Sequence, residues 1–149
     1  MKQVQKILFP IDFASYYEPL LPWVQTFAEK FGATVYVLFV TQDLSSFSSF
    51  HVPHGNIQSF QKEALEGASK KMKAAVQESF KNFPKLESRV EMGKPGDKIV
   101  EFAEKEKMDL IVMGSHGRKG LELAIYGSVA RKVVQNAPCP VLTINPTKA

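Results

Sequence analysis

Four glycines lie between residues 114 and 128, and three of them with the serine that follows form a pattern suited to binding phosphates. Gly114, Gly117, Gly127 and Ser128 give the spacing Gly-x2-Gly-x9-Gly-Ser. Glycine lacks the Cβ that would keep a polyphosphate from the backbone N–H groups, and it permits positive φ angles. Ser128 stands where a helix is expected to begin, so it can cap that helix, and the free amides of residues 128–130 add its positive end.

The residues alone leave a second interpretation open, in which the glycines are ordinary loop glycines and Ser128 is only a cap. The spacing is neither Gly-x-Gly-x-x-Gly nor Gly-x4-Gly-Lys-Ser/Thr, so neither common nucleotide fingerprint applies. Arg118 and Lys119 are either phosphate contacts or solvated loop charges. His116 is interpreted as a loop residue near the phosphates, not as a catalyst.

Two other chemically capable groups do not predict a site. His51 and His54 form a His-x2-His pair, but Pro53 lies between them and no third ligand follows nearby, which argues against a metal site. The single cysteine, Cys139, stands between two prolines at an expected strand boundary. It cannot form an internal disulfide, and we interpret it as structural.

Apolar runs of alternating strand and helix character surround the glycine segment, with a long loop expected over Thr41 to Asn56. The expected strands are Val4–Ile11, Ala33–Val40, Leu86–Met92, Leu110–Met113 and Val141–Ile144. The expected helices are Tyr17–Phe31, Ile57–Phe83, Pro95–Lys107 and Val129–Asn136.

This alternation predicts an α/β fold, a parallel sheet with helices on both faces, formed by a single domain over residues 1–149. Ligands of such sheets bind beyond the carboxyl ends of the strands, where the strand order reverses. Those ends carry Pro10 and Asp12, then Val40, then Gly114. Asp12 has two interpretations, a ligand contact or a turn residue that caps the segment after it.

Composition and charge narrow the class of protein. The chain is 44% hydrophobic and 23% charged, which is ordinary for a globular protein, and it has neither a signal-like N-terminus nor the long uncharged run of a membrane span. The net charge of +4 favours anionic partners, but no basic and aromatic cluster resembles a nucleic-acid surface. We expect a cytoplasmic protein without membrane or nucleic-acid partners.

From end to end the sequence resembles the universal stress protein family. The segments that carry the resemblance are Ile7–Asp12, Gly93–Pro95, Asp109–Arg118 and Ala137–Leu142. The resemblance implies a doubly wound, five-stranded, flavodoxin-like (Rossmann-like) sheet of order 3-2-1-4-5, usually in a homodimer. It also implies ATP binding, because the Gly-x2-Gly-x9-Gly-Ser/Thr motif belongs to the ATP-binding branch.

The resemblance assigns a role to each matching residue. The adenine or ribose would contact Asp12 and the backbone of Val40, with Pro10 on the same wall. The ribose and phosphate turn would be Gly114 and Gly117, and the second phosphate cluster Gly127, Ser128 and Val129. Two residues depart from the family pattern: Phe39 replaces a frequent histidine, and Glu122 replaces a neutral or basic residue. Glu122 would either help to bind Mg²⁺ or weaken ATP binding.

These features favour an ATP-binding regulatory or stress-response protein, with Mg²⁺ accompanying ATP and a homodimer formed through Val141–Ile144. The alternative is a slow ATPase or phosphotransferase that uses the same site. No Walker lysine and no evident residue to orient a nucleophile are present, so efficient catalysis is not expected. A third class, an interaction module with an empty site, is disfavoured by the intact glycine motif.

Overall fold

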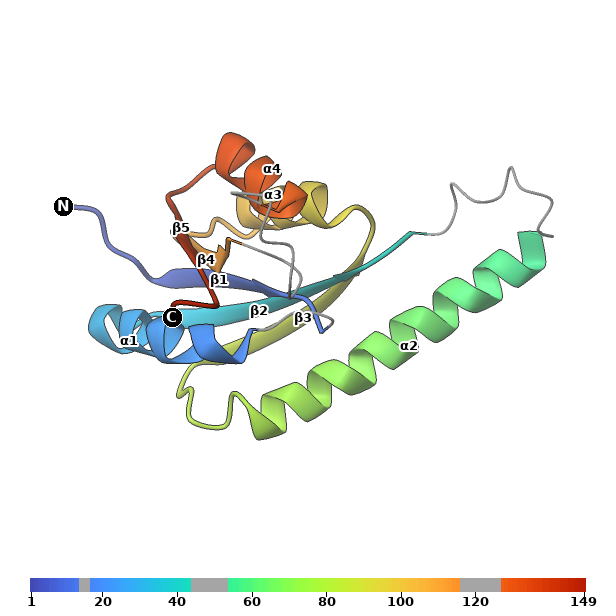
Figure 1. Cartoon of the computed structure of the whole chain (residues 1–149), viewed down its shortest axis with the longest axis horizontal. Coiled ribbons are helices and arrows are strands. Elements are labelled where there is room, and N and C mark those ends of the chain that lie inside the picture. Colours follow the sequence, from blue (N-terminus) through green and yellow to red (C-terminus); the bar gives the residue numbers. More distant parts are fainter. Residues whose placement is uncertain (14–16, 44–53, 116–126) are drawn as a thin grey trace.

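Five parallel strands form one sheet in the order β3-β2-β1-β4-β5, which confirms the predicted order. The computed structural model describes residues 1–13, 17–43, 54–115 and 127–149 (Figure 1). The strands are β1 (Lys6–Ile11), β2 (Thr34–Thr41), β3 (Leu86–Met92), β4 (Leu110–Gly114) and β5 (Val141–Ile144).

Helices cover both faces of the sheet, as predicted. The helical elements are η1 (Glu18–Leu20), α1 (Leu21–Phe31), α2 (His54–Glu78), α3 (Pro95–Lys105) and α4 (Ser128–Asn136). In Figure 1, α1 and α2 lie on one side of the strands, and α3 and α4 lie side by side on the other. No helix in these ranges is both long enough and apolar enough to span a membrane.

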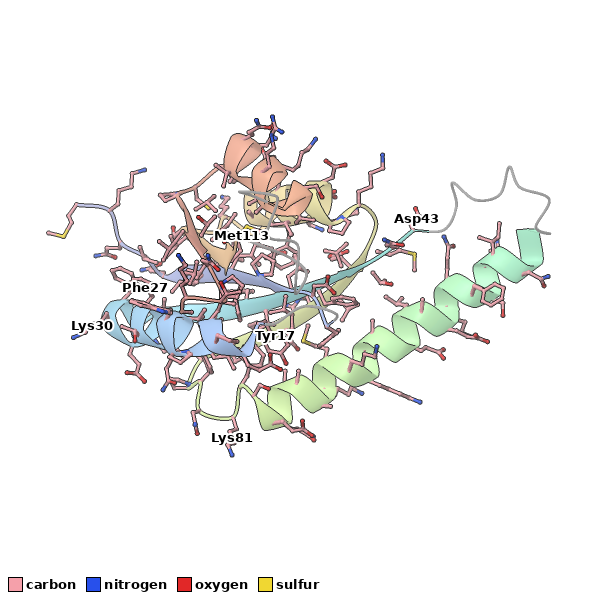
Figure 2. The ribbon with its side chains drawn as sticks, viewed as in Figure 1. Tyr17, Phe27, Lys30, Asp43, Lys81 and Met113 are labelled. Atoms are coloured by element: carbon pink, nitrogen blue, oxygen red, sulfur yellow. The ribbon has the colours of Figure 1, made fainter. Side chains whose placement is uncertain are left out.

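The alternation of side chains along each strand divides the core into two clusters, one on each face. Phe9, Val35 and Val37 pack toward α1 and α2, whereas Leu8 and Leu38 pack toward α3 and α4. Met113, near the end of β4, belongs to the second cluster (Figure 2). Strands buried on both faces explain why the sequence shows continuous apolar runs instead of alternation.

All four predicted helices have different bounds in the structure: α3 ends at Lys105 instead of Lys107, α4 begins at Ser128 instead of Val129, and the first two differ more. The segment expected as one helix from Tyr17 is divided into the 3-10 turn η1 and the helix α1, and each has a proline in its first turn. Proline is accepted there because the first N–H groups of a helix have no partner within it. The predicted split between loop and helix at residues 56 and 57 was also wrong, because α2 already begins at His54.

The prediction that α2 continues to Phe83 was wrong as well. The helix ends at Glu78, and Phe80 and Phe83 follow in a turn closed by the Phe83 N–H donating to the Phe80 carbonyl at 3.1 Å. Both rings are buried, and Phe80 contacts Phe9 of the sheet with ring centroids 6.1 Å apart. These core phenylalanines extended the apolar periodicity past the end of the helix.

Candidate functional site

The carboxyl ends of the strands are staggered where the strand order reverses, and we call the space beyond the end of β1, between β2 and β4, the crevice. Strand β1 ends at Ile11, which is paired with Phe39, whereas β2 continues to Thr41. On the other side of β1, strand β4 ends at Gly114. Because β1 is connected outward to β2 on one side and neighbours β4 on the other, its end marks the position at which ligands of doubly wound sheets bind.

The backbone of Val40 faces this crevice. The Thr34 N–H donates to Gln5 on the β1 side at 2.9 Å, and the Val35 N–H donates to Lys85 on the β3 side at 2.9 Å. Backbone groups alternate between the two neighbours along a strand, so every even-numbered residue of β2 faces β1. Val40 therefore directs its carbonyl beyond the last paired residue of β1, while its side chain is buried in the second cluster.

The other two predicted residues of this wall belong to β1 and its end. Pro10 is half-buried in the strand, opposite Leu38, and Asp12 is exposed directly after the last strand residue. Asp12 thus lies at the same sheet edge as the Val40 backbone. The placement agrees with either interpretation of Asp12, ligand contact or turn residue.

Two backbone hydrogen bonds through Ser115, which we call the clasp, join the two ends of the glycine segment to each other and to β5. The Gly127 N–H donates to the Ser115 carbonyl at 2.9 Å, and the Ser115 N–H donates to the Ile144 carbonyl at 2.8 Å. Ser115 is only 8% exposed and is the one buried polar residue among the described residues. These bonds hold the start of α4 against the carboxyl ends of β4 and β5, beside the crevice.

Helix α4 begins with three amides that have no partner within the helix. Its first internal bond runs from the Arg131 N–H to the Gly127 carbonyl at 3.0 Å, so the N–H groups of Ser128, Val129 and Ala130 precede it. Those three amides, with the positive end of the helix dipole, form an anion-binding end of the kind found at phosphate sites.

Two details of the sequence prediction were wrong at this helix. Gly127, not Ser128, is the N-cap, and no side-chain hydrogen bond caps the helix. Ser128 is the first helical residue and is exposed, which leaves its hydroxyl at the surface. Gly127 has φ −57° and ψ 154°, so positive φ is not the reason for glycine here.

The middle of the glycine segment lies outside the described residues. Of the nine predicted site residues, Gly117 and Arg118 fall there, as do His116, Lys119 and Glu122. The structure brings together the seven others at the carboxyl ends of β1, β2 and β4 and at the start of α4. These seven are Pro10, Asp12, Val40, Gly114, Gly127, Ser128 and Val129.

Sequence reasoning missed the part played by Ser115. Its backbone carries both bonds of the clasp, which no side-chain pattern could indicate. The available signal was its position, directly after the strand-ending Gly114 and at the start of the glycine segment.

Cys139 has the surroundings of a structural thiol. It is half-buried and packs against the cluster beneath α3 and α4. Burial first, and the negative charge of Asp109 second, raise the pKa of the Cys139 thiol. The described residues contain no group of three or more His, Cys, Asp or Glu side chains placed to hold a metal ion, and His51 lies outside them.

Comparison with known proteins identifies relatives over nearly the whole chain. A model described as the universal stress protein family matches residues 3–145. Universal stress protein MJ0531 from Methanocaldococcus jannaschii is 37% identical over 147 residues, which cover 97% of this chain and 84% of the relative.

Solved structures agree with this result. Universal stress protein MJ0577 from the same organism is 30% identical over 152 residues, 94% of each chain. Its structure superposes with a TM-score of 0.80 over 97% of both chains. The structure of the universal stress protein from Archaeoglobus fulgidus in complex with dAMP superposes with a TM-score of 0.62 at 25% identity, over 97% of this chain and 100% of that one. Sequence, fold and strand order together show that this chain belongs to the universal stress protein family.

Proposed function

We propose that this protein binds ATP at the carboxyl ends of β1, β2 and β4 and acts as a nucleotide-dependent regulatory protein in a stress response. The observation that carries the proposal is the clasp between Gly127 and Ser115, which places the open amides of α4 beside the crevice at the end of β1. The complex of the Archaeoglobus fulgidus relative with dAMP supports an adenine nucleotide as the ligand.

The two ends of the nucleotide would meet different chemistry. The adenine and ribose would lie against Pro10, Asp12 and the backbone of Val40, where a carbonyl faces the crevice. The phosphates would lie at the amides of residues 128–130, near Gly114 and the segment containing Gly117 and Arg118. These groups fit an anion, because backbone N–H groups and a helix N-terminus attract phosphate without a positively charged side chain.

Mg²⁺ would enter with ATP and be held mainly through the phosphates, with the Ser128 hydroxyl exposed beside them. Fast hydrolysis requires a group that orients the attacking water. Among the seven described site residues only Asp12, directly after β1, carries a titratable side chain. We therefore expect phosphate release well below the roughly 1 per second of slow kinases. A faster rate that Glu122→Gln or His116→Ala abolishes would assign the protein to catalysis instead.

A homodimer through the edge strand β5 is the second part of the proposal. In β5 the even-numbered residues face β4, as the bonds accepted by Pro140 and Ile144 show. Val141 and Thr143 therefore direct their N–H and C=O groups outward from the sheet. A short open edge of this kind is usually covered, and pairing with a two-fold related copy is the commonest way to cover it.

The nature of the ligand can be tested by mass spectrometry of small molecules released from freshly purified protein. The proposal predicts ATP or another adenine nucleotide at a substantial fraction of one per chain. Protein that releases no nucleotide, and that then takes up none from Mg-ATP after dialysis, would contradict it.

A further inference from the structure

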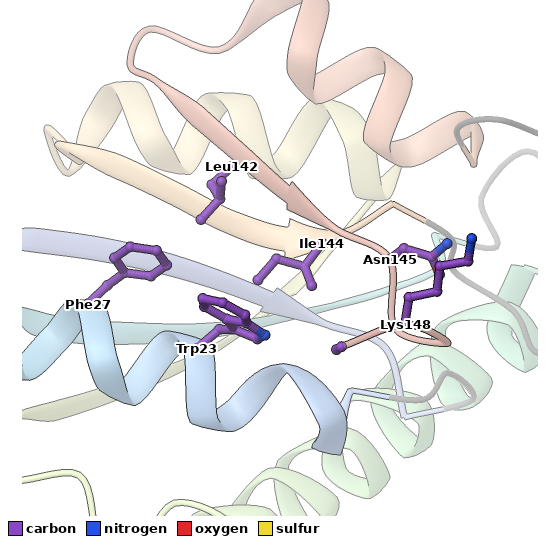
Figure 3. Close-up of a pocket in the computed structure, with 7 residues that line it drawn as sticks. Trp23, Phe27, Leu142, Ile144, Asn145 and Lys148 are labelled. Atoms are coloured by element: carbon purple, nitrogen blue, oxygen red, sulfur yellow. The ribbon is translucent and has the colours of Figure 1, made fainter.

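A hollow of about 250 Å³ lies on the α1 side of the edge strand β5 and shares no residue with the nucleotide site. Its lining residues come from α1, from β5 and from the chain that follows β5. They are Trp23, Phe27, Leu142, Ile144, Asn145, Lys148 and Ala149 (Figure 3).

Trp23 and Phe27 of α1 form the apolar wall of the hollow, and they belong to an aromatic row that continues outside it to Phe31. Trp23, Phe27 and Phe31 follow one another at intervals of four residues, and their rings stack with centroids 6.4 and 6.3 Å apart. Trp23 is 48% exposed, a large apolar surface that a globular protein usually buries or uses for binding. Leu142 and Ile144 form the floor, because they point to the α1 side of the sheet.

The hollow has one polar end. Figure 3 shows Phe27 and Leu142 toward one end and Asn145 and Lys148 at the other. The Asn145 Oδ1 accepts hydrogen bonds from the backbone N–H and the hydroxyl of Thr147, at 3.0 and 2.8 Å. These two bonds fix the side chain and do not use its Nδ2 donors. The Lys148 ammonium forms no ion pair with any residue of the described ranges.

We propose that this hollow binds a small amphipathic anion, a monocarboxylate with an aliphatic or aromatic body. The body would lie on Leu142 and Ile144 against the Trp23 ring, and the carboxylate would meet Lys148 and the Asn145 amide. Charge complementarity at one end and apolar surface at the other select this class over a neutral or fully charged ligand. The volume is below the roughly 300 Å³ of the smallest common ligand pockets, so the ligand is small.

Edge pairing of β5 does not occupy the hollow. A two-fold partner would join in the plane of the sheet, whereas the hollow lies on the face of β5 toward α1. Opposite residues of paired antiparallel strands point to the same face, so the partner's Leu142 and Ile144 would extend the floor.

The experiment uses the fluorescence of Trp23, which is the only tryptophan of the chain. Octanoate titrated into the full-length protein should shift the Trp23 emission saturably, with one site per chain. Hexanoate should bind more weakly, by about two- to fourfold for each methylene removed. Octan-1-ol should bind about two- to fivefold more weakly than octanoate, which is the size of effect expected from one surface charge. Lys148→Met should remove that difference.

A matched pair of variants distinguishes binding in the hollow from nonspecific binding to exposed apolar surface. Trp23→Ala should abolish octanoate binding in calorimetry, while Phe31→Ala should leave it unchanged, since Phe31 is equally exposed on the same helix but does not line the hollow. Equal losses in both variants, or no saturable binding by the wild type, would overturn the proposal. Emission that shifts with protein concentration but not with octanoate would also overturn it, by showing a second copy over Trp23.

Discussion

The two ends of the parallel sheet engage their polar groups in opposite ways. At the amino ends of the strands, the Asp109 carboxylate accepts the N–H groups of Gln5 and Lys6, both at 2.9 Å. The Lys6 ammonium donates to the Glu106 carbonyl at 3.0 Å and lies 5.7 Å from the centre of the Tyr36 ring. At the carboxyl ends, the Val40 carbonyl points beyond the last paired residue of β1, and the first three amides of α4 precede the first internal bond of that helix.

This difference separates stability from binding within one sheet. Charges and amides at the amino ends are satisfied by side-chain and backbone groups of the same chain, so changes there should lower the stability of the fold. In the proposed function, backbone groups at the carboxyl ends contact the nucleotide, so changes there should lower binding while the fold persists. The predictions below test this division.

The largest effect is expected from Gly127→Val. The φ of −57° is accessible to valine, so the fold should persist, but the new side chain would enter the phosphate approach. Loss of even one charge-assisted hydrogen bond would weaken ATP binding by at least about tenfold in calorimetry. Gly67→Val is the matched control, because a Cβ at Gly67 of α2 meets open space and should leave binding unchanged. Equal affinity of wild type and Gly127→Val would show that Gly127 serves only the loop.

The sheet edge gives the next effect. Thr143→Pro removes an outward N–H of β5 but no bond to β4, because the backbone of Thr143 faces away from β4. The variant should therefore convert the proposed dimer to a monomer. Thr143→Val keeps the N–H and should remain dimeric. Light scattering at micromolar concentration distinguishes the two states, and a dimer that survives the proline would place the contact elsewhere.

At the amino ends of the strands, Asp109→Ala should lower the free energy of unfolding by about 2 kcal/mol, because it leaves two backbone N–H groups without their charged acceptor. Asp97→Ala breaks only an exposed ion pair with Lys132 and should cost at most about 1 kcal/mol. Urea denaturation measures both. ATP affinity should be the same in the two variants. A strong loss of ATP affinity in Asp109→Ala would contradict the division of stability and binding between the two ends of the sheet.

The smallest effect concerns Cys139. Burial and then the charge of Asp109 raise the pKa of its thiol, so at pH 8 the native protein holds less thiolate than the unfolded chain and should react more slowly with iodoacetamide. The rate should increase as the pH rises toward that pKa. Asp109→Asn removes the smaller of the two causes and should speed alkylation by about two- to threefold. Unchanged rates would mean that access, not thiolate content, limits the reaction.

The sequence indicated most of the fold because β1, β2 and β4 are distinct buried apolar runs. The two edge strands, Leu86–Met92 and Val141–Ile144, also have the predicted bounds. Helix ends were less predictable. Phe80 and Phe83 continue the helical spacing of α2 although they lie in a turn, since a core can recruit apolar residues from any backbone conformation. The strand order came from the family resemblance, because periodicity contains no information on which strands are neighbours.

The candidate site was predictable in its residue types but not in its assembly. Glycines and Ser128 marked the phosphate segment, and strand ends marked Pro10, Asp12 and Val40. The clasp through Ser115 and the role of Gly127 as N-cap depend on backbone hydrogen bonds between distant segments, which leave no side-chain signature. The Trp23 hollow could not be predicted for a similar reason, because the residues of its floor and of its wall are more than 100 positions apart in the sequence.

The central claim, that the crevice beside α4 binds ATP, is tested most directly by the melting temperature of the nucleotide-free protein with and without Mg-ATP. A ligand at about 100 times its Kd stabilises the folded state by about 2.7 kcal/mol, which for a chain of this length corresponds to a rise of roughly 5 to 10 °C. The account predicts such a rise, with a saturable heat in calorimetric titration. An unchanged melting temperature together with no binding heat would contradict it.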